Sequence, residues 1–312
     1  MKILITGGAG FIGSHLTDYH LAKGDEVCVI DNLSTGTVDN LQSAMENSNF
    51  RFIKADIVSS QLLYPAVEWA DQVYHLASIV GMLKVMEDPL QVLKANIIGT
   101  ERVLGMLTPS QKVLVASSSE VYDLSVGKSF NFVRWNYALS KLTAEALALS
   151  YAKNYNLDVR IARIFNTIGP RQSGSYGMVV PRFVRQAVRG EPITVYGDGR
   201  QSRSFCPVED TIQAFDKLMS APGAKGETFD VGSNCGISIL ELAELIKTLA
   251  KSKSDIVFIP YERVYLEGFE DVRCRAANLN KLFKLADNVW GFGHLDSALD
   301  KIIEWEKSKL IK

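Results

Sequence analysis

The residues best placed to do chemistry are a tyrosine and a lysine four positions apart, Tyr137 and Lys141. Side chains at positions i and i+4 of a helix share one face, so a helix here makes the phenol and the ammonium group neighbours. A cation favours the phenolate and lowers the tyrosine pKa from its usual value of ~10. Reaching neutrality takes about three pKa units, or roughly 4 kcal/mol. The pair predicts a general base for a hydroxyl proton, although the same spacing also occurs on solvated helix faces.

A glycine-rich segment near the N-terminus predicts a site for a dinucleotide. Glycines recur at every third position of Gly7–Gly13, directly after an apolar run that ends at Thr6. Such glycines let the backbone approach a pyrophosphate, which the first N–H groups of the following helix can bind. Asp31 follows the next apolar run and can accept hydrogen bonds from a ribose, whereas it would repel a 2′-phosphate. We therefore expect NAD rather than NADP; the alternative is a strand–helix turn without a ligand.

The order of the apolar runs supplies a scaffold for both features. Short runs predict strands at Lys2–Thr6, Glu26–Ile30, Arg51–Lys54, Gln72–Leu76, Lys112–Ala116 and Val159–Ile164. Helical patterns lie between or after them, at Gly10–Lys23, Pro89–Leu107 and Tyr137–Asn154. Continuously apolar strands that alternate with helices predict an α/β fold with a doubly wound, parallel Rossmann-type sheet. Ligands of such sheets bind beyond the carboxyl ends of the strands.

The second half of the chain differs from the first in its composition and in its pattern of apolar residues. After Asn166 come closely spaced glycines and prolines, with helical patterns at Arg182–Arg189, Ser238–Lys251 and Leu295–Leu310. We expect residues 1–166 to form the NAD-binding domain and residues 167–312 a smaller α/β lobe that binds the substrate. The boundary is soft, and segments of the two parts are expected to interleave.

The composition of the chain limits the kinds of molecule that we expect it to bind. The net charge of −1 predicts no broad attraction to nucleic acid or to an anionic membrane. The four cysteines are far apart and form no C-x-x-C pair, which predicts reduced thiols and no metal site. The N-terminal apolar run is short and rich in glycine, unlike a signal peptide, and no run reaches the length of a membrane span. A cytoplasmic location is expected.

Taken together, these motifs resemble the extended short-chain dehydrogenase/reductase family, and within it the enzymes that act on nucleoside-diphosphate sugars. The resemblance covers nearly the whole chain and includes segments similar to UDP-glucose 4-epimerases and UDP-glucuronate decarboxylases. It implies NAD as the cofactor. It also implies that NAD is bound by Gly7, Gly10, Phe11, Ile12, Gly13, Asp31, Asn32, Asp56, Ile57, Leu76, Ala77, Ser78, Asn96, Ser117, Tyr137 and Lys141. For Asp56, a turn or helix cap is the alternative role.

The resemblance also implies two further catalytic residues near Tyr137. Ser118 matches the family's serine or threonine that orients the sugar hydroxyl. Glu120 matches a carboxylate that acts as base or acid in the dehydratases and decarboxylases, with a structural carboxylate as the alternative. Ser119 stands where dehydratases carry an aspartate acid. Asp123 stands where relatives usually have glycine, and the loop 124–135 is shorter than in many relatives, so the chain departs from the family pattern beside the expected sugar pocket.

The smaller lobe carries the segments that resemble the family's substrate site. The resemblance implies that substrate is bound by Asn166, Val180, Tyr196, Arg203 and Arg275. Tyr196 would lie near the nucleobase, and Arg203 and Arg275 would hold the diphosphate, since a guanidinium stays charged and pairs with two oxygens. For each arginine a surface charge or an internal ion pair is the alternative.

The resemblance implies a first step and leaves its outcome open. Tyr137 takes the proton of a sugar hydroxyl, at C4, as hydride passes to NAD. A 4-keto sugar can then return as the 4-epimer, lose carbon dioxide from a C5 carboxylate, or lose water. We favour a 4-epimerase of a UDP-sugar, with a UDP-glucuronate decarboxylase or a 4,6-dehydratase as alternatives. An alternative outside the enzymes is a catalytically inactive regulator that binds NAD. The family's dimer interface implies a homodimer through Pro89–Leu107 and Tyr137–Asn154.

Overall fold

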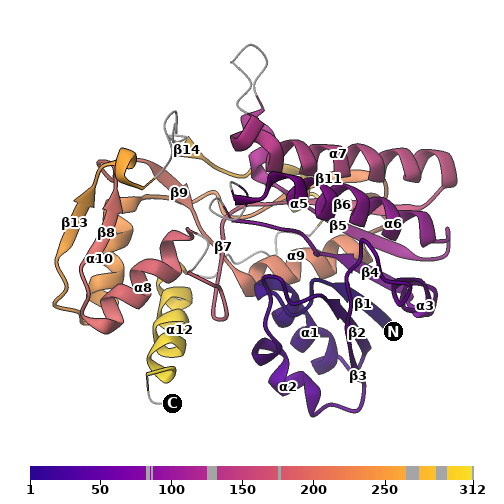
Figure 1. The fold of residues 1–312 in the computed structure, drawn as a ribbon, viewed down its shortest axis with the longest axis horizontal. Coiled ribbons are helices and arrows are strands. Elements are labelled where there is room, and N and C mark those ends of the chain that lie inside the picture. The colour runs from indigo at the N-terminus through magenta and orange to yellow at the C-terminus, as the bar shows by residue number, and fades with distance from the viewer. Residues whose placement is uncertain are drawn as a thin grey trace.

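The large lobe is built on a parallel sheet of seven strands, in the order β11-β6-β5-β4-β1-β2-β3 (Figure 1). The computed structural model describes residues 1–81, 85, 87–124, 132–174, 177–264, 274–285 and 294–310, with the side chains of 132–134 and of 274 and 275 left out. The strands are β1 Lys2–Thr6, β2 Glu26–Asp31, β3 Phe50–Lys54, β4 Gln72–His75, β5 Lys112–Ser118, β6 Asp158–Ile164 and β11 Glu227–Val231. Parallel pairing and the strand order confirm the predicted Rossmann-type fold.

The strand order reverses between β1 and β4, which are neighbours in the sheet but far apart in the chain. On one side of β1 the chain runs outward through β2 and β3, and on the other through β4, β5 and β6. At such a switch point the loops after adjacent strands diverge and leave a crevice at the carboxyl edge. The end of β2 at Asp31 and the end of β5 at Ser118 both lie at this edge.

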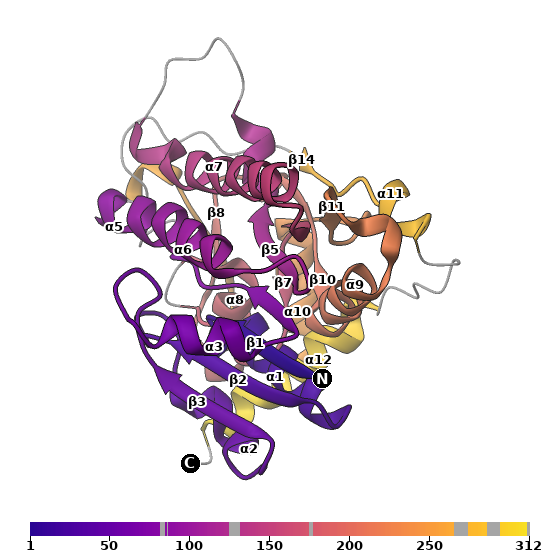
Figure 2. The same cartoon turned by 90° about the vertical axis from the view of Figure 1, so that its right-hand side faces the viewer.

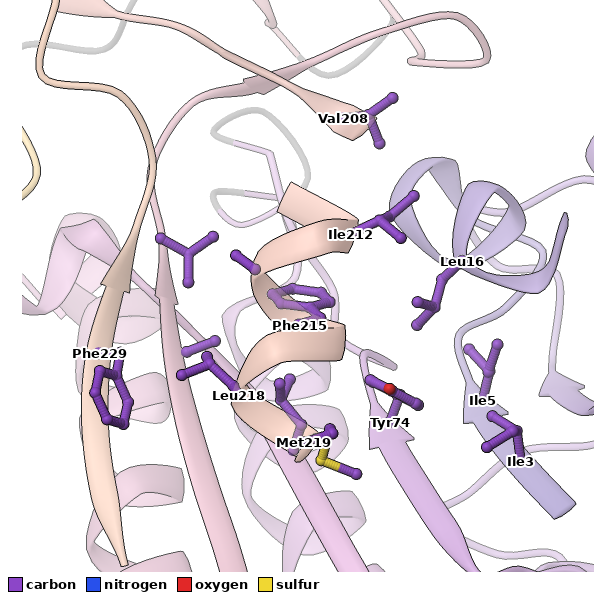
Figure 3. Packing of buried hydrophobic residues seen from close by; sticks show 14 of the residues in the cluster. Ile3, Ile5, Leu16, Tyr74, Val208, Ile212, Phe215, Leu218, Met219 and Phe229 are labelled. Carbon is purple, nitrogen blue, oxygen red and sulfur yellow. The ribbon is translucent and has the colours of Figure 1, made fainter. Parts of the chain in front are cut away.

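Two helices, α1 (Phe11–Ala22) and α9 (Val208–Ser220), cover one face of the sheet. Ile3 and Ile5 point to this face and join Leu16 of α1 and Phe215 of α9 in one buried cluster (Figure 3). Burial of each such side chain contributes roughly 1.5–3 kcal/mol.

The opposite face is covered by α3 (Leu63–Trp69), α6 (Gly99–Met106) and α7 (Phe132–Tyr155), which lie side by side in Figure 2. Leu4, between Ile3 and Ile5, points to this face and joins a second buried cluster. Covering on both faces explains why the strands read as continuous apolar runs.

The smaller lobe lies at the left of Figure 1 and has its own buried cluster. Its helices are α8 Val179–Arg189, α10 Ile239–Leu249 and α12 Leu295–Ser308. Its strands are β7 Thr167–Ile168, β8 Ile193–Tyr196, β9 Ser202–Ser204, β10 Cys206–Pro207, β12 Gly236–Ser238, β13 Ile256–Ile259 and β14 Cys274–Arg275. They form three small sheets, β10-β7, β12-β9-β14 and β13-β8. Short helices α2 Gln42–Met45, α5 Pro89–Leu93 and α11 Asn280–Phe283 complete the two lobes.

Three elements differ from the sequence prediction. The helix expected over Pro89–Leu107 is interrupted by a π-helical turn at Lys94–Ile98, between α5 and α6. Helix α7 begins at Phe132, so Tyr137 lies in its second turn. Strand β11 was not predicted because its sequence, ETFDV, places charges within an edge strand.

The chain returns to the large lobe after residue 166, since β11 pairs with β6 and α9 packs against α1. The division into residues 1–166 and 167–312 stays a prediction. Over the described residues, none of the helices combines the length and the apolar character needed to span a membrane.

Candidate active site

A cavity of about 770 Å³ opens at the carboxyl edge of the large sheet and reaches into the smaller lobe. Its lining includes the glycine loop and Asp31, Tyr137 and Lys141 of α7, and Tyr196 and Arg203 of the smaller lobe. It therefore brings together residues that the sequence separates by nearly two hundred positions.

The glycine loop leaves no space for side chains. Gly7 has a positive φ of 73°, and a Cβ there would lie 2.7 Å from the backbone nitrogen of Ala77. A Cβ on Gly13 would lie 2.4 Å from the carbonyl oxygen of Gly7. Helix α1 begins at Phe11, and its N-cap residue Gly10 provides no side-chain hydrogen bond. Phe11 and Ile12 line the cavity beside the glycines, so the free N–H groups of this helix are available to an anion.

Asp31 is buried at the end of β2 and lines the same cavity. Its carboxylate accepts hydrogen bonds from the backbone N–H of Ala9, at 3.0 Å, and of Leu33, at 2.8 Å. Burial raises its pKa, and these two hydrogen bonds oppose the rise. Each carboxylate oxygen keeps a lone pair for a ribose hydroxyl.

Asn32, Asp56 and Ile57 form the adjoining wall. The amide of Asn32 donates a hydrogen bond of 2.9 Å to Asp56, which also accepts one of 2.7 Å from the backbone N–H of Val58. Asp56 thus closes a turn and borders the cavity at the same time. Both roles considered for it in the sequence are compatible with this position.

Leu76, Ala77 and Ser78 follow β4 and line the cavity, whereas Asn96 lies beneath them and does not. The side-chain oxygen of Asn96 accepts hydrogen bonds of 3.0 Å from both the Ser78 hydroxyl and the backbone N–H of Ile79. Its amide donates one of 2.9 Å to the hydroxyl of Ser140 on α7. Asn96 thus holds the segment Ser78–Ile79 from beneath, and its predicted contact with the cofactor stays a prediction.

Tyr137 and Ser118 face one another in the cavity. The phenol is buried, and the hydroxyl of Ser118, at the end of β5, lies close enough to lower the pKa of the phenol by hydrogen bonding. The Ser118 hydroxyl also accepts a hydrogen bond from the backbone N–H of Glu120. Two hydroxyl groups of this kind can hold a third one, that of a substrate, between them.

The pKa of Tyr137 lies above its ordinary value. Burial raises this pKa, the charge of Glu120 raises it further, and the hydrogen bond from Ser118 opposes both. Burial is the largest cause, because a phenolate loses its hydration there. The expected lowering relies on Lys141 together with the positive nicotinamide ring, and it stays a prediction. A positive charge added beside the phenol would act in the required direction.

Lys141 lies one turn after Tyr137 and is also buried. Its ammonium group donates a hydrogen bond of 2.8 Å to the carbonyl oxygen of Ala116 in β5. Burial lowers its pKa to about 8, and the charge of Glu145 opposes this effect. The group is therefore a cation at neutral pH.

Glu145 is a residue of the site that the sequence analysis missed. It follows Tyr137 and Lys141 by the same spacing of four, so a pattern of tyrosine, lysine and glutamate at i, i+4 and i+8 could have revealed it. Its carboxylate accepts the hydrogen bond of the Ser117 hydroxyl and two from Arg163, at 2.8 and 2.7 Å. Although Ser117 lines the cavity, its hydroxyl is therefore engaged behind it.

Glu120 lies in the short 3-10 helix Ser119–Asp123 that follows β5, and it lines the cavity next to Tyr137. Ser119 and Asp123 also reach the lining. Tyr122 points elsewhere, where its hydroxyl donates a hydrogen bond of 2.8 Å to Asp230. Most of the loop 124–135, which follows this helix, lies outside the described residues.

The smaller lobe contributes Asn166, Val180, Tyr196 and Arg203 to the lining. The amide of Asn166 donates a hydrogen bond of 3.0 Å to the carbonyl oxygen of Ser204, which leaves its side-chain oxygen as an acceptor. Arg203 donates one of 2.8 Å to the carbonyl oxygen of Ser202. These polar groups converge on one region of the cavity, as in sites for a charged ligand.

Arg182 also lines this region, and the sequence analysis did not single it out. Its guanidinium lies 3.6 Å from the centre of the Tyr196 ring, a cation–π arrangement, and the residue is buried. A buried arginine on a helix is unusual, but the sequence alone gives no sign of its burial.

Arg275 lies in β14 beside Arg203 of β9, in register with it. Its side chain lies outside the described residues. The predicted role of Arg275 stays a prediction.

These residues fit NAD. Gly7 and Gly13 form a cradle that any Cβ would fill, the N-terminus of α1 can bind a pyrophosphate, and Asp31 suits a ribose without a 2′-phosphate. Tyr137, Ser118 and Lys141 then lie along the same cavity, where they can move the proton of an alcohol.

Comparison with known proteins agrees with this geometry. The sequence model of the NAD dependent epimerase/dehydratase family matches residues 3–232. A UDP-N-acetyl-alpha-D-glucosaminuronate decarboxylase of Bacillus cytotoxicus is 36% identical, over 97% of this chain and 97% of its own. UDP-glucuronic acid decarboxylase 1 of Danio rerio is 37% identical, over 99% of this chain and 73% of its own. The crystal structure of UDP-glucuronic acid 4-epimerase from Bacillus cereus, with UDP-glucuronic acid and NAD, is similar with a TM-score of 0.87 and 28% identity, covering 99% of this chain and 100% of that chain. The protein is therefore an NAD-dependent enzyme, and it belongs to the NAD dependent epimerase/dehydratase family.

Proposed function

We propose that this enzyme decarboxylates a UDP-linked hexuronate through a 4-keto sugar. The observation that carries the proposal is the carboxyl group of Glu120, which lines the cavity beside Tyr137 and raises its pKa by its charge. The sequence alone favoured a 4-epimerase. The arrangement around Tyr137 changes that preference, because it supplies one proton carrier more than an epimerase uses.

Each residue has a separate task in this reaction. Tyr137 accepts the proton of the C4 hydroxyl, and the neighbouring hydroxyl of Ser118 orients that C4 hydroxyl. NAD, when bound, supplies the acceptor of the C4 hydride and later its donor. Lys141 is a buried cation one turn away and stabilises negative charge on the phenol. At the end Tyr137 returns the proton to the oxygen at C4.

Decarboxylation requires a proton transfer that epimerisation does not. Once C4 is a ketone, the bond from C5 to the carboxylate breaks and its electron pair forms an enolate. That enolate must then gain a proton at C5 as carbon dioxide leaves. Glu120 is the group that we propose for this step: its carboxylate takes up one proton from solvent and donates it to C5, so one proton is consumed for each carbon dioxide released. A 4-epimerase moves only the hydroxyl proton and the hydride. The phenol alone can both remove that proton and return it.

Dehydration would also use a carboxylate near C5, but it needs an acid for the departing hydroxyl group. Ser119 stands where the dehydratases that this chain resembles carry an aspartate, and it has no such acid to offer. Both relatives described above that were found by sequence are decarboxylases, which supports the proposal further. For the Bacillus relative the similarity extends over both lobes, including the substrate lobe.

A UDP-sugar 4-epimerase is the second candidate, since the structure that matches both lobes with a TM-score of 0.87 is one. A silent NAD-binding regulator is disfavoured by the intact set of Ser118, Tyr137 and Lys141 around one cavity. The substrate would bind between the lobes, with Arg182, Tyr196 and Arg203 near its nucleotide.

Product analysis tests the proposal. The purified protein is incubated with NAD and, separately, with UDP-glucuronate, UDP-N-acetylglucosaminuronate and UDP-glucose. We expect carbon dioxide and a UDP-pentose, or its 2-acetamido counterpart, by NMR from one of the uronates. A hexuronate or hexose epimer without carbon dioxide would establish the epimerase instead.

The variant Glu120→Gln tests whether the carboxyl group beside Tyr137 takes part in decarboxylation. We expect it to slow carbon dioxide release by about 10²–10⁴-fold, as loss of a general acid does. Reduction of bound NAD by the substrate should continue and be visible at 340 nm. Glu244→Gln, at an exposed position of α10, is the matched control. Normal carbon dioxide release by Glu120→Gln would assign Glu120 a structural role.

A further inference from the structure

A chain of buried polar groups runs beneath the part of the cavity that Ala77 and Ser78 line. Its members are Thr6 at the end of β1, His75 at the end of β4, Asn96 in the π-helical turn and Thr100 in α6. None of these residues is more than 3% exposed. Thr6 and His75 are register partners of the parallel pair β1 and β4, so their positions are fixed by the sheet.

Within this row of buried polar groups, only one assignment of hydrogen-bond donors and acceptors is possible. The hydroxyl of Thr100 donates its single hydrogen to the carbonyl oxygen of Asn96, at 2.6 Å. It must therefore accept the contact of 3.0 Å from His75, which places a proton on Nε2. The other ring nitrogen, Nδ1, lies 2.8 Å from the hydroxyl of Thr6. In the neutral ring Nδ1 is an acceptor, so Thr6 donates to it.

Both ends of the chain reach the same stretch of the cofactor site. At one end, the Thr6 hydroxyl accepts a hydrogen bond of 3.3 Å from the backbone N–H of Ala77. At the other, Asn96 accepts from Ser78 and from the backbone N–H of Ile79. The segment Ala77–Ile79 is therefore held at both ends by one circuit that passes through the imidazole of His75.

The same circuit is joined to the catalytic helix. The amide of Asn96 donates to Ser140, whose hydroxyl donates a hydrogen bond of 2.7 Å to the carbonyl oxygen of Tyr137. A shift of the His75 ring would therefore displace both the cofactor loop and the turn of α7 that carries the phenol.

A protonated ring would break this arrangement. A proton on Nδ1 would point at the Thr6 oxygen and leave the hydrogen of that hydroxyl without its acceptor. Burial, together with the charge of Lys141, accordingly lowers the pKa of His75 to about 3.

We propose that His75 is a positioning residue of the NAD site, held as the neutral Nε2–H tautomer, which fixes the Ala77–Ile79 segment against α7. It acts through Thr6, Thr100 and Asn96 and does not line the cavity. The proposal concerns cofactor binding and holds for each of the sugar reactions considered above.

The tautomer can be tested in the native enzyme by ¹⁵N NMR of histidine-labelled protein, which has four histidines. The His75 signals are those lost in His75→Gln. We expect Nε2 protonated and Nδ1 unprotonated, with no titration between about pH 5 and 8. A proton on Nδ1, or titration in that range, would overturn the proposal without requiring any variant to be active.

Paired threonine variants test the positioning role through the Kd of NAD, measured by calorimetry at a temperature well below unfolding. Thr100→Val and Thr6→Val keep the side-chain shape and remove the hydroxyl group. We expect each to raise the Kd about tenfold, as expected when a buried partner is left unpaired. Thr100→Ser, which keeps the hydroxyl, should return the Kd to within about threefold of the wild type.

Ser254→Ala is the matched control, because it removes a buried hydroxyl of the smaller lobe. If the role of the chain were only structural, the valine variants would unfold at lower temperature and bind NAD as the wild type does. That result would refute the positioning role. A double variant with both valines should lose little more affinity than either alone, because one break opens the whole circuit.

Discussion

The ammonium group of Lys141 is anchored to the backbone of Ala116, with 2.8 Å between Nζ and the carbonyl oxygen. Ala116 belongs to β5, whose last residue is Ser118, so the cation is fixed relative to the strand that carries the serine. Glu145, one turn further along α7, holds the hydroxyl of Ser117 on the same strand. The proton-transfer groups of helix and strand are thus aligned by two contacts that involve no substrate.

The pKa of Lys141 predicts an alkaline limit to activity. Burial lowers this pKa to about 8, and the reaction uses the cation, so activity should fall as pH rises through about 8. The pH dependence of kcat/KM reports groups of the free enzyme and is the measurement to make. A flat profile from pH 7 to pH 9.5 would contradict the role of the cation.

Glu145→Gln should move that limit to lower pH. The charge of Glu145 raises the pKa of Lys141, so its removal lowers the pKa and shortens the range in which Lys141 is charged. Glu244→Gln, exposed on α10, should leave the profile unchanged. If the profile of Glu145→Gln matched the wild type, the electrostatic link would be excluded.

Tyr137→Phe should lower kcat by at least ~10²-fold, because it removes the group that exchanges the hydroxyl proton. NAD binding should be retained, since the ring fills the same space. Tyr155→Phe, at the exposed end of α7, serves as the control and should retain full activity. Turnover is followed by product NMR and NAD binding by calorimetry. Undiminished turnover of Tyr137→Phe would remove the tyrosine from the mechanism.

Gly13→Ala should weaken NAD binding and destabilise the fold, because its Cβ would lie 2.4 Å from the carbonyl oxygen of Gly7. Backbone atoms of the loop must move to relieve this contact. Gly105→Ala in α6 is the matched control, since the nearest atom there is a side-chain oxygen at 3.4 Å. It should be neutral or stabilise by about 0.5–1 kcal/mol. The unfolding temperature and the Kd of NAD are measured for both variants. If the two variants gave the same values, the glycine loop would not be too crowded for a side chain at residue 13.

Asp31→Asn should reduce the preference for NAD over NADP. The carboxylate lines the cavity and repels a 2′-phosphate, and the amide removes that repulsion. The amide keeps only one of the two backbone contacts, because Ala9 and Leu33 donate to different oxygens, so the ratio of the two Kd values is compared rather than either value alone. We expect the ratio of the two Kd values to change by about tenfold or more. Asp39→Asn, at an exposed position nearby, is the control. An unchanged ratio would mean that another residue sets the cofactor preference.

We propose a homodimer formed through α5 and α7. Leu142 and Leu149 of α7 are each 39% exposed, and Leu90 of the neighbouring helix α5 is 60% exposed. Figure 2 shows these helices side by side on the outside of the sheet. Leu142→Glu combined with Leu149→Glu should yield monomers in sedimentation, whereas Leu62→Glu, on the exposed start of α3, should not. A wild-type monomer at all concentrations would refute the proposal.

The sequence determined the features that depend on local spacing. Continuous apolar runs predicted six strands of the large sheet, because strands covered on both faces have no polar side. Gly7–Gly13 and Asp31 predicted the cofactor, because a close backbone approach admits only glycine. The spacing of Tyr137 and Lys141 predicted their shared helix face, since helical geometry fixes it.

Only the tertiary structure decided what each of these groups experiences. Burial raised the pKa of Tyr137, since desolvation depends on everything packed around the phenol. Glu120 came to lie beside Tyr137, and Arg182 came to lie on the ring of Tyr196, because the folded chain joins segments distant in sequence. The circuit through His75 likewise exists only where β1, β4 and α6 meet. Spacing along a chain specifies local geometry, whereas hydration and long-range contacts follow from packing.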